Sequence, residues 1–301
     1  MKNKTNILIT ALPFYSLSHD IKKLFKKKNI TYKFLQKNKD INDIDIENYD
    51  AIIAGVENYD KKVILKASRL KLISRVGIGT DSINLEFCKK QNIKVFKVKS
   101  PNEAVAEYSI SAIISSLRNF PIMNYNLHNK IWKPELGKSL SESTVGIIGY
   151  GKIGKLIANY LLKLKVGKIL VHDLRKFNKN KNIHFCNKKR IFEESDIVSL
   201  NISLNDKTHN YVSFKEINQI NKPISILNTS RGKIINENAL LHGLKNNKIK
   251  NLFLDVFNEE PYSGKIIKFQ NCMITPHISS FTNKARREME TQAIKNLLNN
   301  I

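Results

Sequence analysis

The sequence predicts an α/β protein made of two parallel-sheet domains. Short apolar runs, such as residues 51–54 and 145–148, alternate with longer stretches that carry apolar residues at helical spacing. Strands that are apolar on both faces are typical of parallel sheets covered by helices on each side. The alternation is interrupted near Pro101 and restarts at Thr144, and a length of 301 residues suits two domains.

The first series predicts a parallel sheet within the N-terminal third of the chain. A long helix with an apolar face is expected after Pro101, from Ala104 to Asn119, and an irregular stretch then runs to Gly137. This stretch holds the only tryptophan, Trp132. The strands expected in this series are residues 6–10, 32–35, 51–54, 72–75 and 95–98.

The second series shows the same pattern more strongly and ends in a helix expected from Thr282 to Asn299. Its expected strands are residues 144–148, 169–172, 197–201, 225–228, 251–255 and 273–275.

The formal net charge of +25 first suggests a nucleic-acid or anionic-membrane partner. However, 43 of the 51 basic residues are Lys and only 8 are Arg, whereas readout of bases and phosphates relies on the planar guanidinium. The lysines run through the whole chain beside 36 equally spread asparagines, which indicates a compositional bias of exposed faces. We therefore expect no nucleic-acid partner.

The three cysteines, Cys88, Cys186 and Cys272, are far apart and form no CxxC pair. This spacing predicts neither a disulfide framework nor a zinc site, and we expect no metal. No stretch is long and apolar enough to span a membrane, and the N-terminus does not read as a signal peptide. A cytoplasmic protein without a membrane partner is expected.

The sharpest local motif is Gly149-Tyr-Gly151-Lys152-Ile153-Gly154, which follows an expected strand and opens an expected helix. This context is that of a Rossmann dinucleotide-binding turn. One glycine allows the tight turn, the second lets the backbone approach a pyrophosphate, and the third lets the helix pack against the strand. The amide groups at the start of the helix then face the phosphates.

An acidic residue, Asp173, closes the next expected strand, 24 positions after Gly149. A carboxylate there accepts hydrogen bonds from ribose hydroxyls and repels a 2′-phosphate, so the pattern favours NAD over NADP. Arg175, two residues later, leaves NADP open, because an arginine at this place can hold that phosphate. A purely structural turn that binds nothing is the other alternative.

Three later segments, residues 228–232 (Asn-Thr-Ser-Arg-Gly), 255–261 (Asp-Val-Phe-Asn-Glu-Glu-Pro) and 275–278 (Thr-Pro-His-Ile), indicate which kind of dinucleotide protein this is. In this order and spacing the chain resembles the D-isomer-specific 2-hydroxyacid dehydrogenases, particularly their phosphoglycerate dehydrogenase branch. The resemblance begins near Leu72 and continues to the C-terminus. It includes Arg75-Val-Gly-Ile-Gly-Thr-Asp81, Ala104-Val-Ala-Glu107 and Ser199-Leu-Asn-Ile-Ser203.

The resemblance implies a catalytic trio of Arg231, Glu260 and His277. Oxidation of a 2-hydroxyacid removes the hydroxyl proton while hydride leaves the carbon, and an imidazole suits the proton transfer near neutral pH. A carboxylate on the second ring nitrogen would fix the tautomer, and a guanidinium would bind the substrate carboxylate at two points. Each residue alone has a structural explanation, as a loop, a turn or a residue after proline.

The resemblance also implies NAD as cofactor and a discontinuous arrangement of domains. A flavodoxin-like substrate domain would comprise residues 1–98 with 282–301, and the Rossmann cofactor domain residues 99–281, with catalysis between them. Asp255 would hold the nicotinamide carboxamide, although a helix or turn cap is its alternative role. Thr229 and Ser230 would line the nicotinamide side.

On the substrate side, Gly77, Ile78 and Gly79 would form a nest of amide groups for the substrate carboxylate, or simply a glycine-rich turn. Arg75 matches a basic position near the phosphate in phosphoglycerate dehydrogenases, so a small anionic acid such as 3-phosphoglycerate is expected. Two departures bear on substrate identity: the segment between Pro101 and Ala104 is shorter than usual, and Ser203 replaces a common proline. We expect no serine-regulated domain after Ile301.

The resemblance implies a homodimer, in which the segment around Trp132 reaches onto the partner or, alternatively, fills its own core. Two other functions are left open by the residues. One is a binding protein that senses NAD(H), similar to the corepressors that resemble this family. The other is nucleic-acid binding through the positive charge, which would depend on salt.

Overall fold

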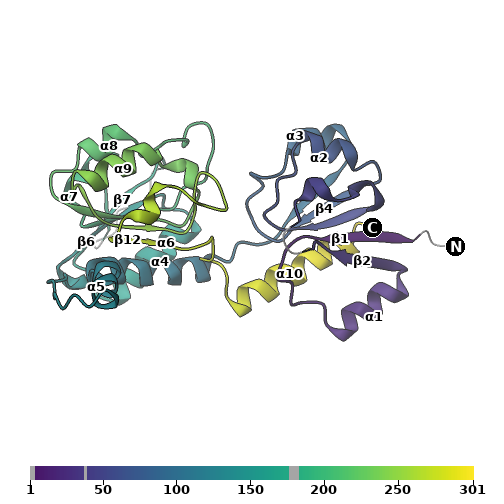
Figure 1. The fold of residues 1–301 in the computed structure, drawn as a ribbon, viewed down its shortest axis with the longest axis horizontal. Helices are drawn as coiled ribbons and strands as arrows, with labels where there is room; N and C mark the ends of the chain where they lie inside the picture. Colours follow the sequence, from purple (N-terminus) through teal and green to yellow (C-terminus); the bar gives the residue numbers. More distant parts are fainter. Residues whose placement is uncertain (1–3, 37–38, 176–182) are drawn as a thin grey trace. The chain divides into compact units, whose positions relative to one another are not determined.

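Every strand pairing runs parallel in the computed structural model, which describes residues 4–36, 39–175 and 183–301. The chain forms two compact units: Met1–Pro101 together with Phe281–Ile301, and Asn102–Ser280. The expected fold class is confirmed, with two α/β domains that each contain one parallel sheet (Figure 1).

The first unit contains a five-stranded sheet in the order β2-β1-β3-β4-β5, which is the order of a flavodoxin-like fold. Its helices include the last helix of the chain, α10, which packs on β3, β4 and β5 (Figure 1). The elements are β1 (Thr5–Ile9), α1 (His19–Lys27), β2 (Ile30–Phe34), β3 (Ala51–Ala54), α2 (Lys61–Lys66), β4 (Leu72–Arg75), α3 (Leu85–Lys90), β5 (Lys94–Lys97) and α10 (Asn283–Leu298).

Strand β1 shows why this sheet is covered on both faces. Ile7 and Ile9 point to the face that α1 and α10 cover, where they pack in one cluster with Phe25 and Ile294. Leu8 points to the opposite face and packs in a second cluster with residues of α2 and α3. Alternation along a strand explains the continuous apolar run, because both faces bury side chains.

The second unit contains a seven-stranded sheet in the order β12-β11-β10-β9-β6-β7-β8, which is a Rossmann order extended by one strand. Its elements are α4 (Asn102–Leu117), α5 (Phe120–His128), β6 (Thr144–Ile148), α6 (Lys152–Lys163), β7 (Lys168–His172), β8 (Ile183–Phe185), α7 (Lys188–Glu194), β9 (Ile197–Leu200), α8 (Phe214–Asn218), β10 (Ile224–Asn228), α9 (Glu237–Lys245), β11 (Ile249–Leu254) and β12 (Cys272–Ile274). Short 3-10 turns are Ile41–Asp43 and Ile46–Asn48 in the first unit, and Leu140–Glu142, Gly232–Ile234 and Lys265–Lys268 in the second.

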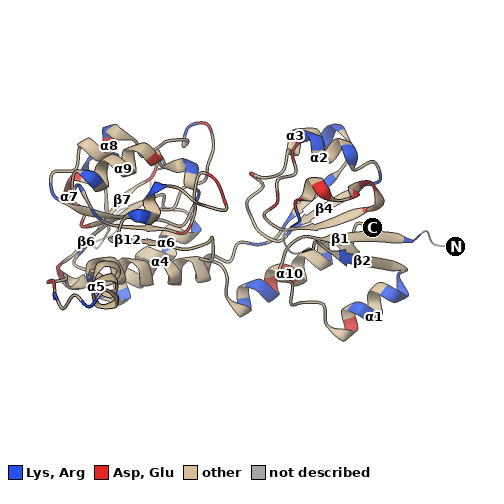
Figure 2. Cartoon of the chain, viewed as in Figure 1, with Lys and Arg blue, Asp and Glu red and all other residues tan. Residues whose placement is uncertain are grey.

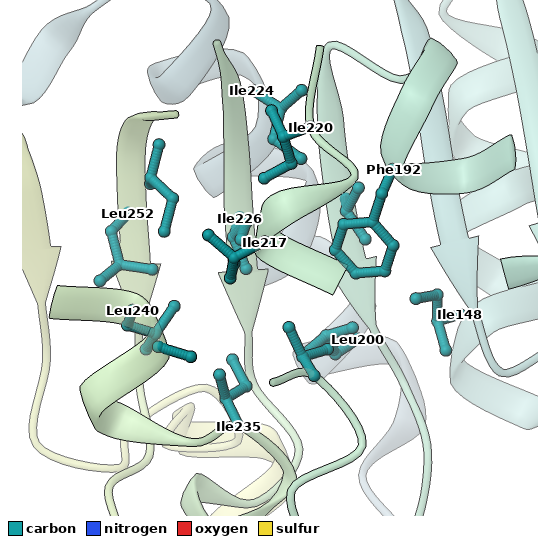
Figure 3. Packing of buried hydrophobic residues seen from close by; sticks show 14 of the residues in the cluster. Ile148, Phe192, Leu200, Ile217, Ile220, Ile224, Ile226, Ile235, Leu240 and Leu252 are labelled. Carbon is teal, nitrogen blue, oxygen red and sulfur yellow. The ribbon is translucent and has the colours of Figure 1, made fainter. Parts of the chain in front are cut away.

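Two apolar clusters cover the two faces of this larger sheet. On one face, strand residues such as Ile226 and Leu252 meet Phe192, Ile217 and Leu240 from the covering helices (Figure 3). On the other face, α4 and α6 pack against the remaining strand side chains. The strands are therefore fixed on both sides, which keeps the loops at their carboxyl ends in defined places.

The stretch after Asn119 differs from the sequence prediction, since it is not irregular throughout. Helix α5 forms there, with Pro121 in its first turn, where a missing amide hydrogen costs nothing. Trp132 follows this helix with 86% of its surface exposed. The alternative in which Trp132 fills its own core is therefore wrong.

Basic residues are spread over helices and loops of both units, with acidic residues between them (Figure 2). Within the described ranges, no helix is long and apolar enough to cross a membrane.

Candidate active site

The glycine turn between β6 and α6 needs glycine at two positions for steric reasons. Gly149 has a φ of +94°, and a Cβ there would lie 2.5 Å from the carbonyl oxygen of Asn201. A Cβ at Gly154 would overlap the carbonyl oxygen of Gly149. The turn is thus tight and closely packed on its strand, as the motif predicts.

Gly151 differs from the other two glycines, because nothing lies within 4 Å of the place where its Cβ would be. It is the N-cap of α6, a 12-residue helix, and as a glycine it offers no side-chain acceptor to the first helical amide groups, those of Lys152 and Ile153. A pyrophosphate fits this place, since the backbone leaves room for it and the helix terminus supplies donors and a favourable dipole.

Asp173 follows the last residue of β7 and is hydrogen-bonded on both oxygens. Its Oδ2 accepts from the Tyr150 amide at 2.7 Å and from Arg175 Nη2 at 3.0 Å, while Oδ1 accepts from Arg175 Nε at 3.0 Å and its amide at 2.9 Å. The side-chain bonds of Arg175 outweigh partial burial and hold the pKa of Asp173 at about 2. Arg175 therefore lies against the carboxylate expected to bind ribose.

Arg231 lies in the loop after β10, which a buried asparagine shapes. The side chain of Asn228 donates to the Arg231 carbonyl at 2.8 Å and accepts from the amide and hydroxyl of Ser230, at 3.0 and 2.6 Å. Arg231 Nη1 donates to the Ser230 carbonyl at 2.7 Å. Thr229, which is 8% exposed, shares a 3.2 Å hydrogen bond with Ser109 of α4.

Glu260 lies in the loop after β11, and its side chain bonds back to that loop. Its Oε1 accepts from the Phe257 amide at 3.0 Å, and the bond to Pro261 is cis. Burial alone would raise the pKa of Glu260, but hydrogen bonds and charge from His277, with smaller effects of Phe257 and Arg231, lower it below 4.5. Glu260 is therefore ionised throughout the neutral range.

His277 lies in the loop after β12 and has a left-handed φ of +55°. Its Nδ1 is 2.8 Å from Glu260 Oε2, and just over a third of its side chain is exposed. A carboxylate on Nδ1 leaves Nε2 as the nitrogen that can exchange a proton with a ligand.

The loops that carry the three residues are packed against one another. Gly232, which follows Arg231, contacts the backbone of Phe257 and Asn258 so closely that a Cβ would overlap the Phe257 carbonyl group. The structure thus brings the loop of Arg231 against the loop of Glu260, and joins the latter to His277 by a hydrogen bond. The arrangement provides a cation, a proton donor or acceptor and a supporting anion at the carboxyl edge of the sheet that also bears the glycine turn.

Comparison with known proteins agrees with this geometry. Residues 110–279, more than half of the chain, match the model of the D-isomer specific 2-hydroxyacid dehydrogenase NAD binding domain. This chain belongs to that family. It is 31% identical to a glyoxylate reductase of Thermofilum pendens over 84% of this chain and 78% of the relative. A hydroxypyruvate reductase of Thermotoga maritima is 28% identical over 82% of each chain.

Among solved structures, a D-lactate dehydrogenase of Aquifex aeolicus complexed with NAD and lactic acid has the same fold. Its TM-score is 0.83 at 24% identity, with 97% of this chain and 94% of that chain covered. The chain is therefore an oxidoreductase of the D-2-hydroxyacid dehydrogenase family with the family's NAD-binding domain, as the sequence predicts.

The residues expected on the substrate side of this family member lie in the first unit, at the end of β4 and in the loop that follows it. Arg75 Nη1 donates to the carbonyl groups of Ala54 and Val76, at 3.4 and 3.1 Å, so its guanidinium contacts both the end of β3 and its own loop. In this described loop, the amide groups of residues 77–79 donate to no backbone carbonyl group. Gly77 has a φ of +156°, and its Cα lies beside the Arg75 guanidinium.

Sequence reasoning missed several polar side chains that shape these loops. Asn228 opens the segment 228–232, but no role was predicted for it. A polar residue at the end of a buried strand is a signal that its side chain supports the following loop. Tyr108 and Thr275 also received none, and their contact joins residues 167 positions apart. Among the described residues, no cluster of His, Cys, Asp or Glu is arranged to hold a metal ion.

Proposed function

We propose that this family member reduces a small 2-oxo acid to the D-2-hydroxyacid with NADH, and that Arg231, Glu260 and His277 are its catalytic residues. The observation that carries this proposal is the 2.8 Å contact between His277 Nδ1 and Glu260 Oε2, in loops packed beside that of Arg231. An imidazole held by an ionised carboxylate is suited to donate a proton at its other nitrogen.

When bound at the glycine turn, NADH would supply the hydride for reduction of the carbonyl carbon. His277 Nε2 then gives its proton to the carbonyl oxygen, and the substrate becomes a hydroxyl-bearing acid. Glu260 stabilises the imidazolium before this transfer, because its lowered pKa keeps it negatively charged. Arg231 binds the substrate carboxylate and polarises the carbonyl group. Oxidation reverses each step.

For the cofactor, we propose that Gly149, Gly151, Lys152, Ile153 and Gly154 form the pyrophosphate site. The open space at Gly151 and the uncapped start of α6 support this role.

Asp173 is proposed to bind the adenosine ribose, for which Arg175 must turn away, since all four acceptor positions of the carboxylate are in use. Arg175 is 64% exposed and can do so at little cost. Thr229, Ser230 and Asp255 are proposed for the nicotinamide end.

For the substrate, glyoxylate or hydroxypyruvate is proposed, in keeping with the reductases to which the chain is similar. The amide groups of Gly77, Ile78 and Gly79 would bind the substrate carboxylate, with Arg75 nearby. Next to this loop, Glu57 accepts a 2.5 Å hydrogen bond from Thr10, which places a carboxylate at the same sheet edge. That charge disfavours a phosphorylated acid.

3-Phosphoglycerate is the second candidate, and the observation in its favour is Arg75 itself. The guanidinium would have to leave the carbonyl groups of Ala54 and Val76 to bind a phosphate.

A panel of 2-oxo acids with NADH, and of 2-hydroxyacids with NAD, tests the proposal by absorbance at the NADH band. The panel contains glyoxylate, hydroxypyruvate, pyruvate and 3-phosphoglycerate. We expect His277→Ala to lower kcat by at least about a thousandfold while the Kd for NADH changes little. His128→Ala is the matched control, because His128 is exposed on α5 and bonds only to its own helix at Asn124.

The same panel distinguishes an enzyme from the alternative, a binding protein that senses NAD(H). Tight NADH binding without turnover of any acid would favour the sensor, and normal turnover by His277→Ala would remove His277 from the proposed role.

We further propose that the second unit pairs with another copy of this chain. Apolar side chains on and after α5 are strongly exposed: Phe120 (52%), Leu127 (59%), Ile131 (46%), Trp132 (86%) and Leu136 (96%). An exposed apolar set of this size favours an interface. Sedimentation should show a dimer for the wild type and a monomer for the double variant Trp132→Glu, Leu136→Glu; a dimer in both would contradict this surface.

A further inference from the structure

A chain of three hydroxyl and carboxyl groups links helix α4 to the loop that carries His277. The phenol of Tyr108 donates to Thr275 Oγ1 at 2.7 Å, and Thr275 Oγ1 donates to Asp255 Oδ1 at 2.7 Å. The Tyr108 ring also packs edge-on against Phe253, with ring centroids 5.7 Å apart. The three groups therefore form a chain of hydrogen bonds with one direction: Tyr108 donates to Thr275, and Thr275 donates to Asp255.

Asp255 ends this chain of hydrogen bonds and holds the backbone that follows His277. Its side chain is fully buried, and its two oxygens accept from the Ile278 amide at 2.7 Å and from the Ser279 amide at 2.8 Å. The hydroxyl of Thr275, two residues before His277, and the two amides that follow His277 thus all bond to Asp255, which fixes the backbone on both sides of His277. Three hydrogen bonds to one buried side chain are more than a turn cap needs.

The loop needs this support because His277 adopts an unfavourable backbone conformation. Its φ of +55° is in the left-handed region, which side chains with a Cβ rarely occupy unless the surroundings impose it. Its amide donates to the Thr275 carbonyl at 3.0 Å, which closes a tight turn over Pro276. Without Asp255, the loop would be free to relax toward an ordinary conformation and carry the imidazole away from Glu260.

We propose that Tyr108 and Thr275 are positioning residues that orient Asp255, and through Asp255 hold His277 in the conformation that contacts Glu260. This inference rests on the proposed role of His277, but the loop conformation is measurable without turnover. The pKa of Tyr108 is raised, mainly by burial, so its phenol keeps the proton it donates. Removing either hydroxyl leaves an acceptor of the chain without its donor.

Matched variants of Thr275 test the proposal. Thr275→Val removes the hydroxyl at nearly constant shape, whereas Thr275→Ser keeps it. With NADH and whichever 2-oxo acid is turned over, we expect Thr275→Val and Tyr108→Phe to lower kcat about tenfold, with the Kd for NADH within about twofold of wild type. Thr275→Ser should restore kcat to within about twofold of wild type. Equal kcat in Thr275→Val and Thr275→Ser would overturn the proposal.

The double variant tests whether the two hydroxyls act as one chain. If they do, Tyr108→Phe combined with Thr275→Val lowers kcat no further than Thr275→Val alone. Independent effects, about a hundredfold together, would overturn the chain. Should Thr275→Val fail to fold, Tyr108→Phe with its own wild-type comparison keeps the proposal testable.

Hydrogen exchange of the Ile278 and Ser279 amides provides a readout apart from catalysis. We expect at least about tenfold faster exchange at both amides in Thr275→Val and unchanged exchange in Thr275→Ser. Unchanged exchange in both variants would overturn the positioning role. If His277→Ala keeps normal turnover, the proposed catalytic role of His277 fails, and the exchange result still decides whether Thr275 orients this loop.

Discussion

Replacing Gly232 with alanine should separate two of the loops that carry the proposed catalytic residues, without removing any of their side chains. A Cβ at this position would overlap the Phe257 carbonyl group and lie 2.5 Å from the Asn258 nitrogen. These are backbone atoms, so no flexible side chain can turn aside. The loop of Arg231 and the loop of Glu260 must move apart instead.

The expected size of the effect follows from this overlap. Ordinary contact with the Phe257 backbone requires the loops to separate by roughly 1.5 Å, and a misplacement of about 1 Å already costs about a hundredfold in rate. Overpacking of this kind also lowers the free energy of unfolding by about 1–3 kcal/mol. We therefore expect Gly232→Ala to lower kcat/KM about a hundredfold, while the glycine turn still binds NADH.

The assay combines steady-state kinetics, NADH binding by fluorescence and thermal unfolding. Gly243→Ala, within helix α9, is the matched control, because the atoms nearest to its Cβ would all belong to side chains: Cδ1 and Cγ1 of Ile249 at 2.7 and 2.9 Å, and Cγ2 of Ile217 at 3.1 Å. The control should keep turnover near that of the wild type. A folded Gly232→Ala protein with kcat/KM within about threefold of wild type would refute the packing argument.

Three further predictions concern charged groups. Because the pKa of Glu260 lies below 4.5 in the folded protein, its contact with His277 stabilises the fold fully above about pH 4.5, and this contribution is lost as pH falls through the lowered pKa. Thermal unfolding across pH should therefore show a Tm advantage of wild type over Glu260→Gln that shrinks below that pH; a constant difference would contradict the pairing. Asp173→Ala should weaken NADH binding and reduce the preference for NADH over NADPH, whereas Arg175→Ala should strengthen NADH binding, as Kd values for both cofactors will show. Glu290 is fully buried and accepts two loop amides and a guanidinium, so Glu290→Gln should lower the free energy of unfolding by about 3 kcal/mol in denaturant titrations; a loss under 0.5 kcal/mol would contradict it.

Strands whose apolar runs end at turn residues could be predicted to the residue. The expected ranges 51–54, 72–75 and 144–148 coincide with β3, β4 and β6, since burial on both faces makes each run continuous. β8 was missed because Ile183–Phe185 has three residues with an exposed histidine between two apolar ones. So short a pattern is not distinct from a loop.

Helix α5 was missed because Pro121 resembles a helix breaker when only the sequence is available. The structure places it in the first turn, where proline is tolerated, after Asn119 in a left-handed conformation. The exposure of Trp132 could not be predicted either, because an aromatic residue in a polar segment suits a core and an interface equally well.

The candidate site was predictable where the chemistry requires a residue type in a fixed motif. The glycine turn and the proposed trio of Arg231, Glu260 and His277 were singled out in this way, and the structure brings the loops of the three residues together. Tertiary hydrogen bonds could not be predicted, because no local sequence pattern indicates them. The hydrogen bonds from the loop after β12 to the Asp255 side chain are of this kind.

The order of the strands explains why residues 46 positions apart can act together. β10, β11 and β12 are consecutive neighbours in the sheet, so their carboxyl ends lie side by side at roughly 5 Å spacing. Arg231 and His277 each follow their strand by three residues, and Glu260, in a longer loop after β11, bonds to His277. The ends of the strands determine where such short loops lie. Two buried polar side chains at those ends, Asn228 and Asp255, then determine the course of the loops by hydrogen bonds to their backbone. Catalytic geometry in this fold therefore depends on side chains that do not contact the substrate, and loss of the Asn228 side chain should reduce kcat while substrate carboxylate and NADH still bind.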